Sequence, residues 1–324
     1  MTQTIVGVLR GGTSSEYPLS LRTGAVMHEA LPEERYQTKD ILVDKRGVWH
    51  VRGIPVDPAR ALSQVDVALN GMHGGVGEDG TVGRVLERAR VPYVGSRPLP
   101  SGLALNKIRA REILQRAGIR MPRAVSFTHS TSIPTGEMAR AVFQEFGPPY
   151  LVKPALEGAG HGIQHAATVI DLSDAIGDVL DSHGAAVVEE YVIGDESTVA
   201  IIQEFRGDAL YAPPPAHVIL PQGVKHFDFD THHNATARYV VPSNFSRHEK
   251  VALIDIARAA HQALGLSHMS RADIILTRRG PYLLEINALP GLYDGASLPP
   301  MLESVGSSVG EYLQHGIALA QSGR

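Results

Sequence analysis

The sequence predicts an α/β protein, and three observations support this fold class. Near the amino end, apolar strands run into glycine-rich turns that lead into helical segments. In the middle of the chain, another apolar strand ends in a lysine and a further glycine-rich turn. Towards the carboxyl end, polar and apolar residues alternate along a hairpin. The length of 324 residues leaves room for two or three domains of roughly 100 to 200 residues each.

The first domain is predicted to end near residue 96, because prolines at positions 92, 98 and 100 interrupt regular structure there. Gly11 and Gly12 follow its first strand, and the run from His73 to Gly80 follows a later one. Its elements are expected at 4–9 (strand), 20–30 (helix), 65–69 (strand) and 81–89 (helix), with 91–95 as the closing segment.

Two further domains are expected, over 97–187 and 188–324, after a first domain over 1–96. Ser101 is the predicted N-cap of a helix that ends at Gly118. The other elements are expected at 150–152, 185–188 and 199–203 (strands), 247–264 (helix), and 270–276 with 282–287 (hairpin).

The composition excludes several classes of function. Thirty basic and 34 acidic residues give a net charge of −4, so no general attraction to nucleic acid or to an anionic membrane is expected. The absence of cysteine excludes disulfides, thiolate catalysis and cysteine-ligated metal centres. No apolar run approaches the roughly 18 residues of a membrane span, and the first residues do not resemble a signal peptide. We therefore expect a cytoplasmic protein.

The hairpin predicts a metal site. Symmetric pairing of its strands would place Asp273 opposite Glu285 and Arg271 opposite Asn287, while Leu284 would take the other, apolar face. Two carboxylates and an amide oxygen in one cluster favour Mg²⁺ or Mn²⁺ over zinc. The alternative is a solvated hairpin face in which the arginine pairs with a carboxylate. The apolar flank argues against it, because two close carboxylates in a buried sheet need a counter-ion.

A second cluster predicts phosphate binding. Lys153 ends an apolar strand and the glycine-rich run 158–162 follows, so backbone N–H groups and a fixed positive charge could hold phosphate oxygens. The residue order of a Walker A loop is absent. Lys107, on the preceding helix, could add a second phosphate contact. Glu189 and Glu196 could hydrogen-bond an adenine amine and ribose hydroxyls, although each could also be a surface residue.

Two glycine-rich turns at the amino end predict a ligand crevice. Segments 11–16 and 73–80 each follow a strand, and loops at the carboxyl ends of α/β strands are where ligands bind. Neither contains GxGxxG, so a dinucleotide site is only weakly indicated. Glu16 could receive a substrate ammonium group and His73 a carboxylate. The alternative for His73 is a residue that only caps its tight turn.

Taken in this order, the segments resemble the ATP-grasp superfamily and, within it, the D-alanine:D-alanine ligases of bacterial cell-wall synthesis. The resemblance covers nearly the whole chain. It is carried by GGTSSE with SLRTG, HGGVGEDG, LNK, VKPALEG, VVEEYVIGDESTVAI, SRADIIL, and LLEINALPGL followed by SLPP. It implies a three-domain ATP-grasp architecture, with an amino-terminal α/β domain that binds substrate, a central lid domain and a carboxyl-terminal α+β domain that binds metal.

The resemblance also implies roles for individual residues. ATP would be held by Lys107, Lys153, Glu189, Glu190, Val192 and Glu196, and two Mg²⁺ or Mn²⁺ ions by Asp273, Glu285 and Asn287. Glu16 and His73 would bind the first amino acid, and Arg271, Ser297 and Leu298 the second. Glu16, Arg271 and Ser297 would also belong to the catalytic residues. The backbone of Gly291 would stabilise the oxyanion.

The implied reaction uses ATP to convert the first D-alanine to an acyl phosphate, which the amine of the second then attacks. Because water would destroy that intermediate, a mobile lid is expected, and 221–242 is the candidate. A homodimer is expected from the family alone.

Two departures from the family leave the product open. Ala159 and Gly160 occupy positions where the family usually has two serines. In the lid, His232 or His233 occupies the position of the family's tyrosine, and the family's lid lysine is also missing. D-alanine:D-lactate ligases resemble this pattern in carrying a lid histidine, which when protonated would favour a hydroxy acid. The alternatives are therefore a ligase that joins D-alanine to D-lactate or another amino acid, and a nucleotide-binding homologue without catalysis. The complete metal triad argues against the last.

Overall fold

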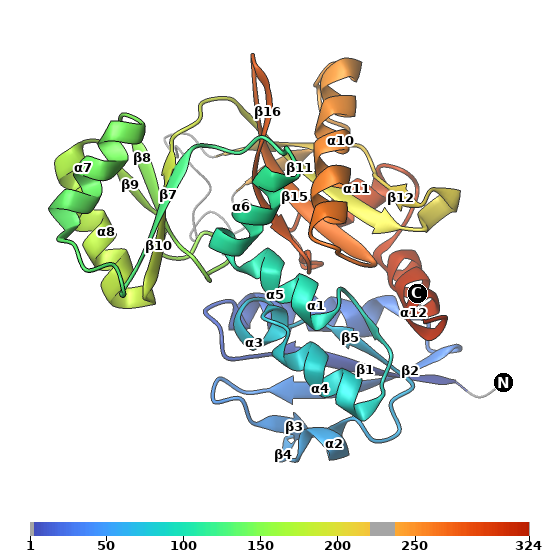
Figure 1. Cartoon of the computed structure of the whole chain (residues 1–324). Coiled ribbons are helices and arrows are strands. Elements are labelled where there is room, and N and C mark those ends of the chain that lie inside the picture. The colour runs from blue at the N-terminus through green and yellow to red at the C-terminus, as the bar shows by residue number, and fades with distance from the viewer. Residues whose placement is uncertain (1–2, 221–236, 324) are drawn as a thin grey trace.

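Three β-sheets organise the computed structural model, which describes residues 3–220 and 237–323 (Figure 1). The strands of each sheet come from one stretch of the chain: 4–94, 124–190 and 195–287. The predicted α/β class is confirmed. Among the described residues no helix is long and apolar enough to cross a membrane.

The first sheet is mixed. Its strands are β1 (Thr4–Gly11), β2 (Tyr36–Val43), β3 (Trp49–Val51), β4 (Ile54–Pro55), β5 (Val67–Asn70) and β6 (Tyr93–Val94), and its helices are α1 (Tyr17–Ala30), α2 (Pro58–Ala61), α3 (Gly75–Glu78) and α4 (Thr81–Ala89). The strand order is β4-β3-β2-β1-β5-β6. Strands β2, β1, β5 and β6 are parallel because helical segments connect them, whereas β3 and β4 continue the sheet in antiparallel fashion. The carboxyl ends of β1 and β5 therefore present their glycine-rich turns at one edge.

The ends of two helices follow from single residues. The helix α1 begins at Tyr17 rather than at the predicted Ser20, because Pro18 fits the first helical turn, where a missing N–H is harmless. Farther along, Gly118 takes a positive φ of 77°, which agrees with its prediction as the residue that stops a helix.

One predicted helix is wrong. In place of a single helix over 101–118, two helices meet at Asn106: α5 (Pro98–Leu105) and α6 (Lys107–Arg116). The Asn106 backbone is extended, and its side chain accepts a hydrogen bond from the first turn of α6. Ser101, predicted as the N-cap, lies inside α5. The polar asparagine thus divides a stretch that has continuous apolar spacing.

The second sheet is antiparallel, with the order β7-β10-β8-β9. Its elements are β7 (Ala124–Thr128), α7 (Thr135–Glu145), β8 (Tyr150–Pro154), β9 (Gln164–Ala166), α8 (Val169–His183) and β10 (Ala185–Glu190). Apolar residues of α7 and α8 pack with those of the four strands in one core, and Figure 1 shows both helices on the outer side. The predicted glycine-rich turn connects β8 to β9.

The third sheet has the order β14-β13-β11-β15-β16, with β12 paired to β11. Its strands are β11 (Asp195–Gln203), β12 (Leu210–Tyr211), β13 (Ala216–Ile219), β14 (Arg238–Val240), β15 (Met269–Thr277) and β16 (Gly280–Asn287). The helical elements of this part are η1 (Phe205–Gly207), α10 (Arg247–Ala263), α11 (Leu298–Glu303) and α12 (Val309–Gln321). Val199 and Ile201 of β11 pack with α10, while the alternate Ala200 and Ile202 join a core with α11 and α12.

The helix α12, at the carboxyl end of the chain, packs against the amino-terminal sheet. Leu313 and Ile317 of α12 share a core with Val6 and Val8 of β1. Figure 1 accordingly shows the red carboxyl-terminal helix close to the blue amino-terminal sheet. The first and last thirds of the sequence are therefore packed together, and the domain bounds 1–96, 97–187 and 188–324 stay a prediction.

The hairpin of β15 and β16 has the register that the metal-site prediction needs. Asp273 pairs with Glu285, and Arg271 pairs with Asn287. A bulge between Asp273 and Ile274 shifts the register nearer the turn. The prediction that Leu284 faces away from Glu285 is wrong, because the extra residue turns Leu284 into a cavity and Leu283 takes the core position.

Candidate active site

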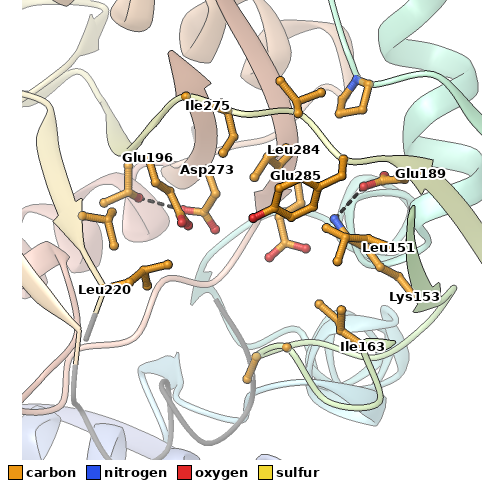
Figure 2. A pocket seen from close by; sticks show the side chains of 18 of the residues that line it. Leu151, Lys153, Ile163, Glu189, Glu196, Leu220, Asp273, Ile275, Leu284 and Glu285 are labelled. Atoms are coloured by element: carbon orange, nitrogen blue, oxygen red, sulfur yellow. Dashed lines mark hydrogen bonds and ion pairs between the residues drawn. The ribbon is translucent and has the colours of Figure 1, made fainter. Parts of the chain in front are cut away.

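A cavity of about 350 Å³ lies between the second and third sheets, and Figure 2 shows it from close by. Its walls come from β8, β10, β11, β13, β15 and β16, together with the glycine-rich turn after β8. A volume of this size is in the range of small-molecule sites. Part of the wall is apolar and includes Leu151, Ile163, Leu220, Ile275 and Leu284.

Most of the residues predicted for nucleotide, metal and substrate line this cavity. They are Lys107, Lys153, Glu189, Glu190, Val192, Glu196, Arg271, Asp273, Glu285 and Ser297. The structure thus brings together segments that lie far apart in the sequence, while the role of each residue stays a prediction.

Glu189, in β10, lies between two cations. Its Oε2 atom is 2.6 Å from Lys153 Nζ, and its Oε1 atom accepts a hydrogen bond from Arg111. All three side chains are buried. Burial raises the pKa of a carboxyl, but Lys153 and Arg111 hold the pKa of Glu189 below its ordinary value. Both oxygens have partners, so the predicted hydrogen bond to an adenine amine would require one oxygen to be shared.

Lys107 connects the glycine-rich turn to the hairpin. Its Nζ atom donates a hydrogen bond of 2.6 Å to the carbonyl oxygen of Glu157 and lies 3.4 Å from Oε2 of Glu285. Burial raises the pKa of Glu285, but Lys107, Lys153 and Arg271 together lower it to about 2. Glu285 is therefore an anion at neutral pH.

Asp273 is the centre of a hydrogen-bonded group opposite Glu285. Its Oδ2 atom accepts hydrogen bonds from Arg271 Nη2 at 2.8 Å and from Asn287 Nδ2 at 3.3 Å, and its Oδ1 atom accepts one from Thr198 Oγ1 at 2.8 Å. Burial raises the pKa of Asp273, Arg271 opposes this shift, and the charge of Glu285 adds to it. The three residues predicted to hold metal thus converge on one place.

Glu196 lies near Asp273 at the same side of the cavity (Figure 2). Burial and the charge of Asp273 raise the pKa of Glu196 to about 7. Near neutral pH this carboxyl group is therefore close to half protonated, and a ligand that donates hydrogen bonds would favour its anionic form.

A second, smaller cavity of about 30 Å³ lies on the side of the amino-terminal loops. It is lined by Glu16, His73, Glu78, Leu105, Gly158, Ala159, Arg271, Asn287, Leu289, Gly291 and Tyr293. Arg271 and Ala159 line both cavities, so the two spaces adjoin.

Glu16 is buried beside the glycine-rich turn. A Cβ atom on Gly158 would come within 2.4 Å of Glu16 Oε1, so a side chain at this position would force the carboxyl group to shift. Burial and the charge of Glu78 raise the pKa of Glu16 to about 8. The carboxyl group is therefore largely neutral at pH 7 unless a cation comes next to it, and a substrate ammonium group would be such a cation.

His73 is held by its neighbours. Its Nε2 atom is 2.7 Å from Thr23 Oγ1, its Nδ1 atom is 3.8 Å from Glu78 Oε1, and its ring lies edge-on to Tyr293. These contacts agree with the interpretation that His73 fixes its turn. The side chain also lines the smaller cavity, and its role with substrate stays a prediction.

Arg271 Nε and Ser297 Oγ are among the buried polar side-chain atoms that have no hydrogen-bond partner within residues 3–220 and 237–323. Both side chains line the larger cavity. Since buried polar groups are normally hydrogen-bonded, these atoms suit the carboxylate of a ligand. Leu298 differs, because its side chain packs in the core and only its backbone could contact a substrate.

The sequence analysis missed three residues of the site: Arg111, Thr198 and Glu78. Arg111 follows Lys107 by one turn of α6, and this spacing could have indicated it. Thr198 follows Glu196 by two residues on β11, which places both on one face of the strand. Glu78 lies within the glycine-rich run 73–80, but nothing in its spacing indicates an effect on Glu16.

The predicted lid is described only in part. Positions 221–236, which include His232 and His233, lie outside the described residues. Ala159, which replaces an expected serine, has a φ of 49° and packs against a small cluster that contains Leu19 and Tyr293.

Comparison with known proteins agrees with this geometry. The chain matches the sequence models of the amino-terminal and carboxyl-terminal parts of D-ala D-ala ligases over residues 52–96 and 113–316. It is similar to a D-alanine–D-alanine ligase of Desulforudis audaxviator (strain MP104C), with 30% identity over 320 residues and 98% of each chain covered.

Two solved structures have a similar fold. One is the VanG D-Ala:D-Ser ligase from Enterococcus faecalis, with a TM-score of 0.84, 25% identity, and coverage of 98% of this chain and 100% of that one. The other is a D-alanine–D-alanine ligase from Bacillus anthracis complexed with ATP, with a TM-score of 0.81, 24% identity, and coverage of 99% and 98%.

Proposed function

The chain belongs to the D-ala D-ala ligase family of ATP-dependent enzymes, and from this premise we propose that it joins two D-alanine molecules to form D-alanyl-D-alanine. ATP would be converted to ADP and phosphate. The observation that carries the proposal is the meeting of two cavities at Arg271. One contains lysines and carboxylates suited to a metal nucleotide, and the other contains a buried glutamate suited to an amino acid.

The residues at the hairpin fit a hard divalent cation. Glu285 is an anion, and Asp273 faces it across the strand pair. Asn287 donates a hydrogen bond to Asp273 through Nδ2, so its side-chain amide oxygen can serve as a metal ligand. Asp273, Glu285 and Asn287 would therefore hold Mg²⁺ or Mn²⁺. When bound, such ions offset negative charge on the phosphate oxygens of ATP.

In the first step, a carboxylate oxygen of the first D-alanine would attack the γ-phosphorus of ATP, and ADP would leave. Lys107 and Lys153 would stabilise the charge on the transferring phosphoryl group. Glu16 would become ionised and hold the ammonium group of this D-alanine, which fixes the direction of its carboxylate.

In the second step, the neutral amine of the second D-alanine would attack the acyl carbon, the bond to phosphate would break, and the nitrogen would lose a proton as the amide forms. The Nε atom of Arg271 and the Oγ atom of Ser297 would bind the carboxylate of this D-alanine. The backbone of Gly291, in the smaller cavity, would lie near the developing oxyanion.

This dipeptide would serve as a precursor of peptidoglycan, in agreement with the family. The substrates and ATP are small soluble molecules, so we place the reaction in the cytoplasm. The homodimer expected from the resemblance remains part of the proposal.

A different second substrate is the other candidate. The observation that favours it is the similarity in fold to a ligase named for D-alanine and D-serine, together with the lid histidines of the sequence. D-Lactate, D-serine or another amino acid would then take the place of the second D-alanine at Arg271 and Ser297.

Mass spectrometry of the products tests both candidates. Purified protein would be incubated with ATP, Mg²⁺ and D-alanine, alone or with an equal amount of D-lactate or D-serine, at pH values on both sides of about 6.5, where an unperturbed histidine titrates. We expect D-alanyl-D-alanine to dominate throughout. A mixed product that dominates would support the second candidate, and ATP binding without any product would support a non-catalytic homologue.

A further inference from the structure

A group of three side chains beside the nucleotide cavity has no part in the reaction described above. Glu157 and His161 lie in the glycine-rich turn after β8, and His183 is the last residue of α8. Their potential ligand atoms all lie within 4.8 Å of one another. In the described part of the chain, no other group of three or more histidine and acidic side chains meets that condition.

The two imidazoles approach the same carboxylate from different sides. His161 Nδ1 is 3.6 Å from Glu157 Oε2, and His183 Nδ1 is 3.9 Å from Glu157 Oε1. The two rings lie edge to face, with their centroids 5.7 Å apart. Gly162 leaves the space that the His183 ring occupies, because a Cβ atom there would be 2.8 Å from His183 Nε2.

These separations are close to those of a zinc site. Zn²⁺ bonds to imidazole nitrogen and carboxylate oxygen at about 2.0 to 2.2 Å, so two ligands of a tetrahedral ion are roughly 3.3 Å apart. The ligand atoms of His161 and His183 would each need to move only a few tenths of an ångström towards the carboxylate. All three side chains are partly exposed, so an ion could reach them from solvent.

A hydrogen bond from a residue outside the cluster also orients the carboxylate of Glu157. Ser15 Oγ donates a hydrogen bond of 3.1 Å to Glu157 Oε2. Outer hydrogen bonds of this kind fix the position of a ligating carboxylate. Lys107 contacts the carbonyl oxygen of Glu157, and among the described residues no lysine or arginine forms an ion pair with the Glu157 carboxylate.

We propose that Glu157, His161 and His183 form a binding site for Zn²⁺ or a chemically similar transition-metal ion, separate from the magnesium ligands on the hairpin. Two nitrogen donors and one carboxylate favour zinc over magnesium, whereas Asp273, Glu285 and Asn287 offer oxygen alone. The remaining coordination position is available to water or to an anionic ligand in the larger cavity, which Glu157 and His161 also line.

An ion at this site would hold the glycine-rich turn to α8. The same turn lines both cavities through His161 and Ala159, and it reaches the amino-terminal loop through Ser15. Zinc would therefore stabilise the folded chain as any ligand of the native state does, by an amount that rises with its concentration above the dissociation constant.

Calorimetry with the full chain tests the site. The protein, without a histidine tag, is stripped of metal with a chelator, placed in excess Mg²⁺ to occupy oxygen sites, and titrated with ZnCl₂ at pH 7.5. CoCl₂ serves as a spectroscopic probe, because nitrogen-ligated Co²⁺ absorbs visible light. We expect one equivalent of Zn²⁺ to bind, and the double variant His161→Ala/His183→Ala to bind at least about a hundredfold more weakly.

Matched variants show whether the loss is specific. His129→Ala and His165→Ala remove histidines near α8 and on β9 that lie outside the cluster, and they should bind zinc like the parent chain. The single variants His161→Ala and His183→Ala provide the same test if the double variant does not fold. A variant with His226, His232 and His233 all replaced by alanine controls for binding by those histidines.

Any of three results would overturn the proposal. One is equal zinc affinity in the parent chain and in the His161 and His183 variants. Another is an absence of zinc binding in the parent chain, with no rise in its thermal midpoint and no visible absorption from Co²⁺. Loss of binding only in the variant of the other three histidines would place the ion elsewhere and would also refute the site.

Discussion

Two kinds of buried or partly buried glutamate border the paired cavities, and they differ in their nearest cation. Glu189 and Glu285 lie 2.6 and 3.4 Å from lysine nitrogens, and both have a pKa below the ordinary value. Glu16 and Glu196 form no ion pair within 4.0 Å among the described residues, and their pKa values rise to about 8 and about 7. Burial raises the pKa of all four groups, so the adjacent cation decides the sign.

The opposite pKa shifts distinguish glutamates that are already paired with a lysine from glutamates that would be paired only when a ligand binds. A carboxylate with a lysine beside it is a fixed anion, which positions that lysine and attracts metal. A buried carboxyl group without a cationic partner is at least partly protonated near pH 7 and becomes fully ionised when a cation binds. The first kind is therefore expected to act on phosphate and metal, and the second kind on the ammonium and hydroxyl groups of substrates.

The largest effect is expected from Glu285→Gln, which converts a fixed anion into a neutral amide of the same shape. Loss of its charge removes a metal ligand, so kcat/KM should fall at least about a thousandfold. Steady-state kinetics with a coupled assay for ADP would measure this, and thermal unfolding would show that the variant is folded. The control Glu112→Gln, on an exposed face of α6, should leave kcat/KM unchanged. Comparable activity in both variants would contradict the metal assignment.

The second effect tests the paired glutamate Glu189. Lys153→Met keeps the length of the side chain but leaves Glu189 with Arg111 alone, so urea unfolding without nucleotide should show a loss of about 2 to 3 kcal/mol. The double variant Lys153→Met/Glu189→Gln no longer buries that charge. Its free energy of unfolding should be higher than the sum of the two single changes predicts. Simple additivity would mean that the pair contributes nothing.

The third effect is expected at the junction of the two cavities. Arg271→Ala removes the group proposed to bind the carboxylate of the second amino acid, so the KM of that site should rise about a hundredfold, equivalent to about 2.7 kcal/mol. The KM for ATP should change far less. Initial rates over a range of D-alanine concentrations separate the two amino-acid sites. The exposed Arg109→Ala is the matched control. Equal changes in both KM values would refute the acceptor-site assignment.

The sequence predicted the hairpin well because strand pairing is a local rule. Asp273 stands opposite Glu285 as the symmetric register required, and the apolar alternation of β15 is intact. Leu284 was placed on the wrong face because a bulge adds one residue without leaving a mark in the alternation. The Asn106 break was missed for a similar reason, since apolar spacing continues across it while the Asn106 side chain caps the start of a second helix.

The electrostatic character of the site could not be predicted from the sequence. Glu189 and Arg111 are 78 positions apart, and their pairing depends on how α6 packs against β10. Glu16 and Glu78 are likewise separated in sequence, so the high pKa of Glu16 follows only from the fold that buries them together. The residue types that could carry out the chemistry were visible, whereas the charge state of each carboxyl group depends on its neighbours in three dimensions.

The smallest effect concerns the unpaired glutamate Glu16 and takes the form of a pH dependence. Its raised pKa of about 8 means that the carboxyl group is mostly protonated below pH 8 and mostly ionised above it. Since only the anion attracts an ammonium group, the KM for the first D-alanine should fall by up to about tenfold between pH 7 and pH 8.5. Glu16→Gln should abolish this dependence and leave the KM high.

Glu78→Gln removes a neighbouring negative charge and should therefore move the midpoint to lower pH, since that charge contributes to the raised pKa of Glu16. A KM that is flat over this range in the parent chain, or a midpoint that Glu78→Gln does not move, would mean that Glu16 is ionised before substrate binds and that the contrast with Glu285 is wrong.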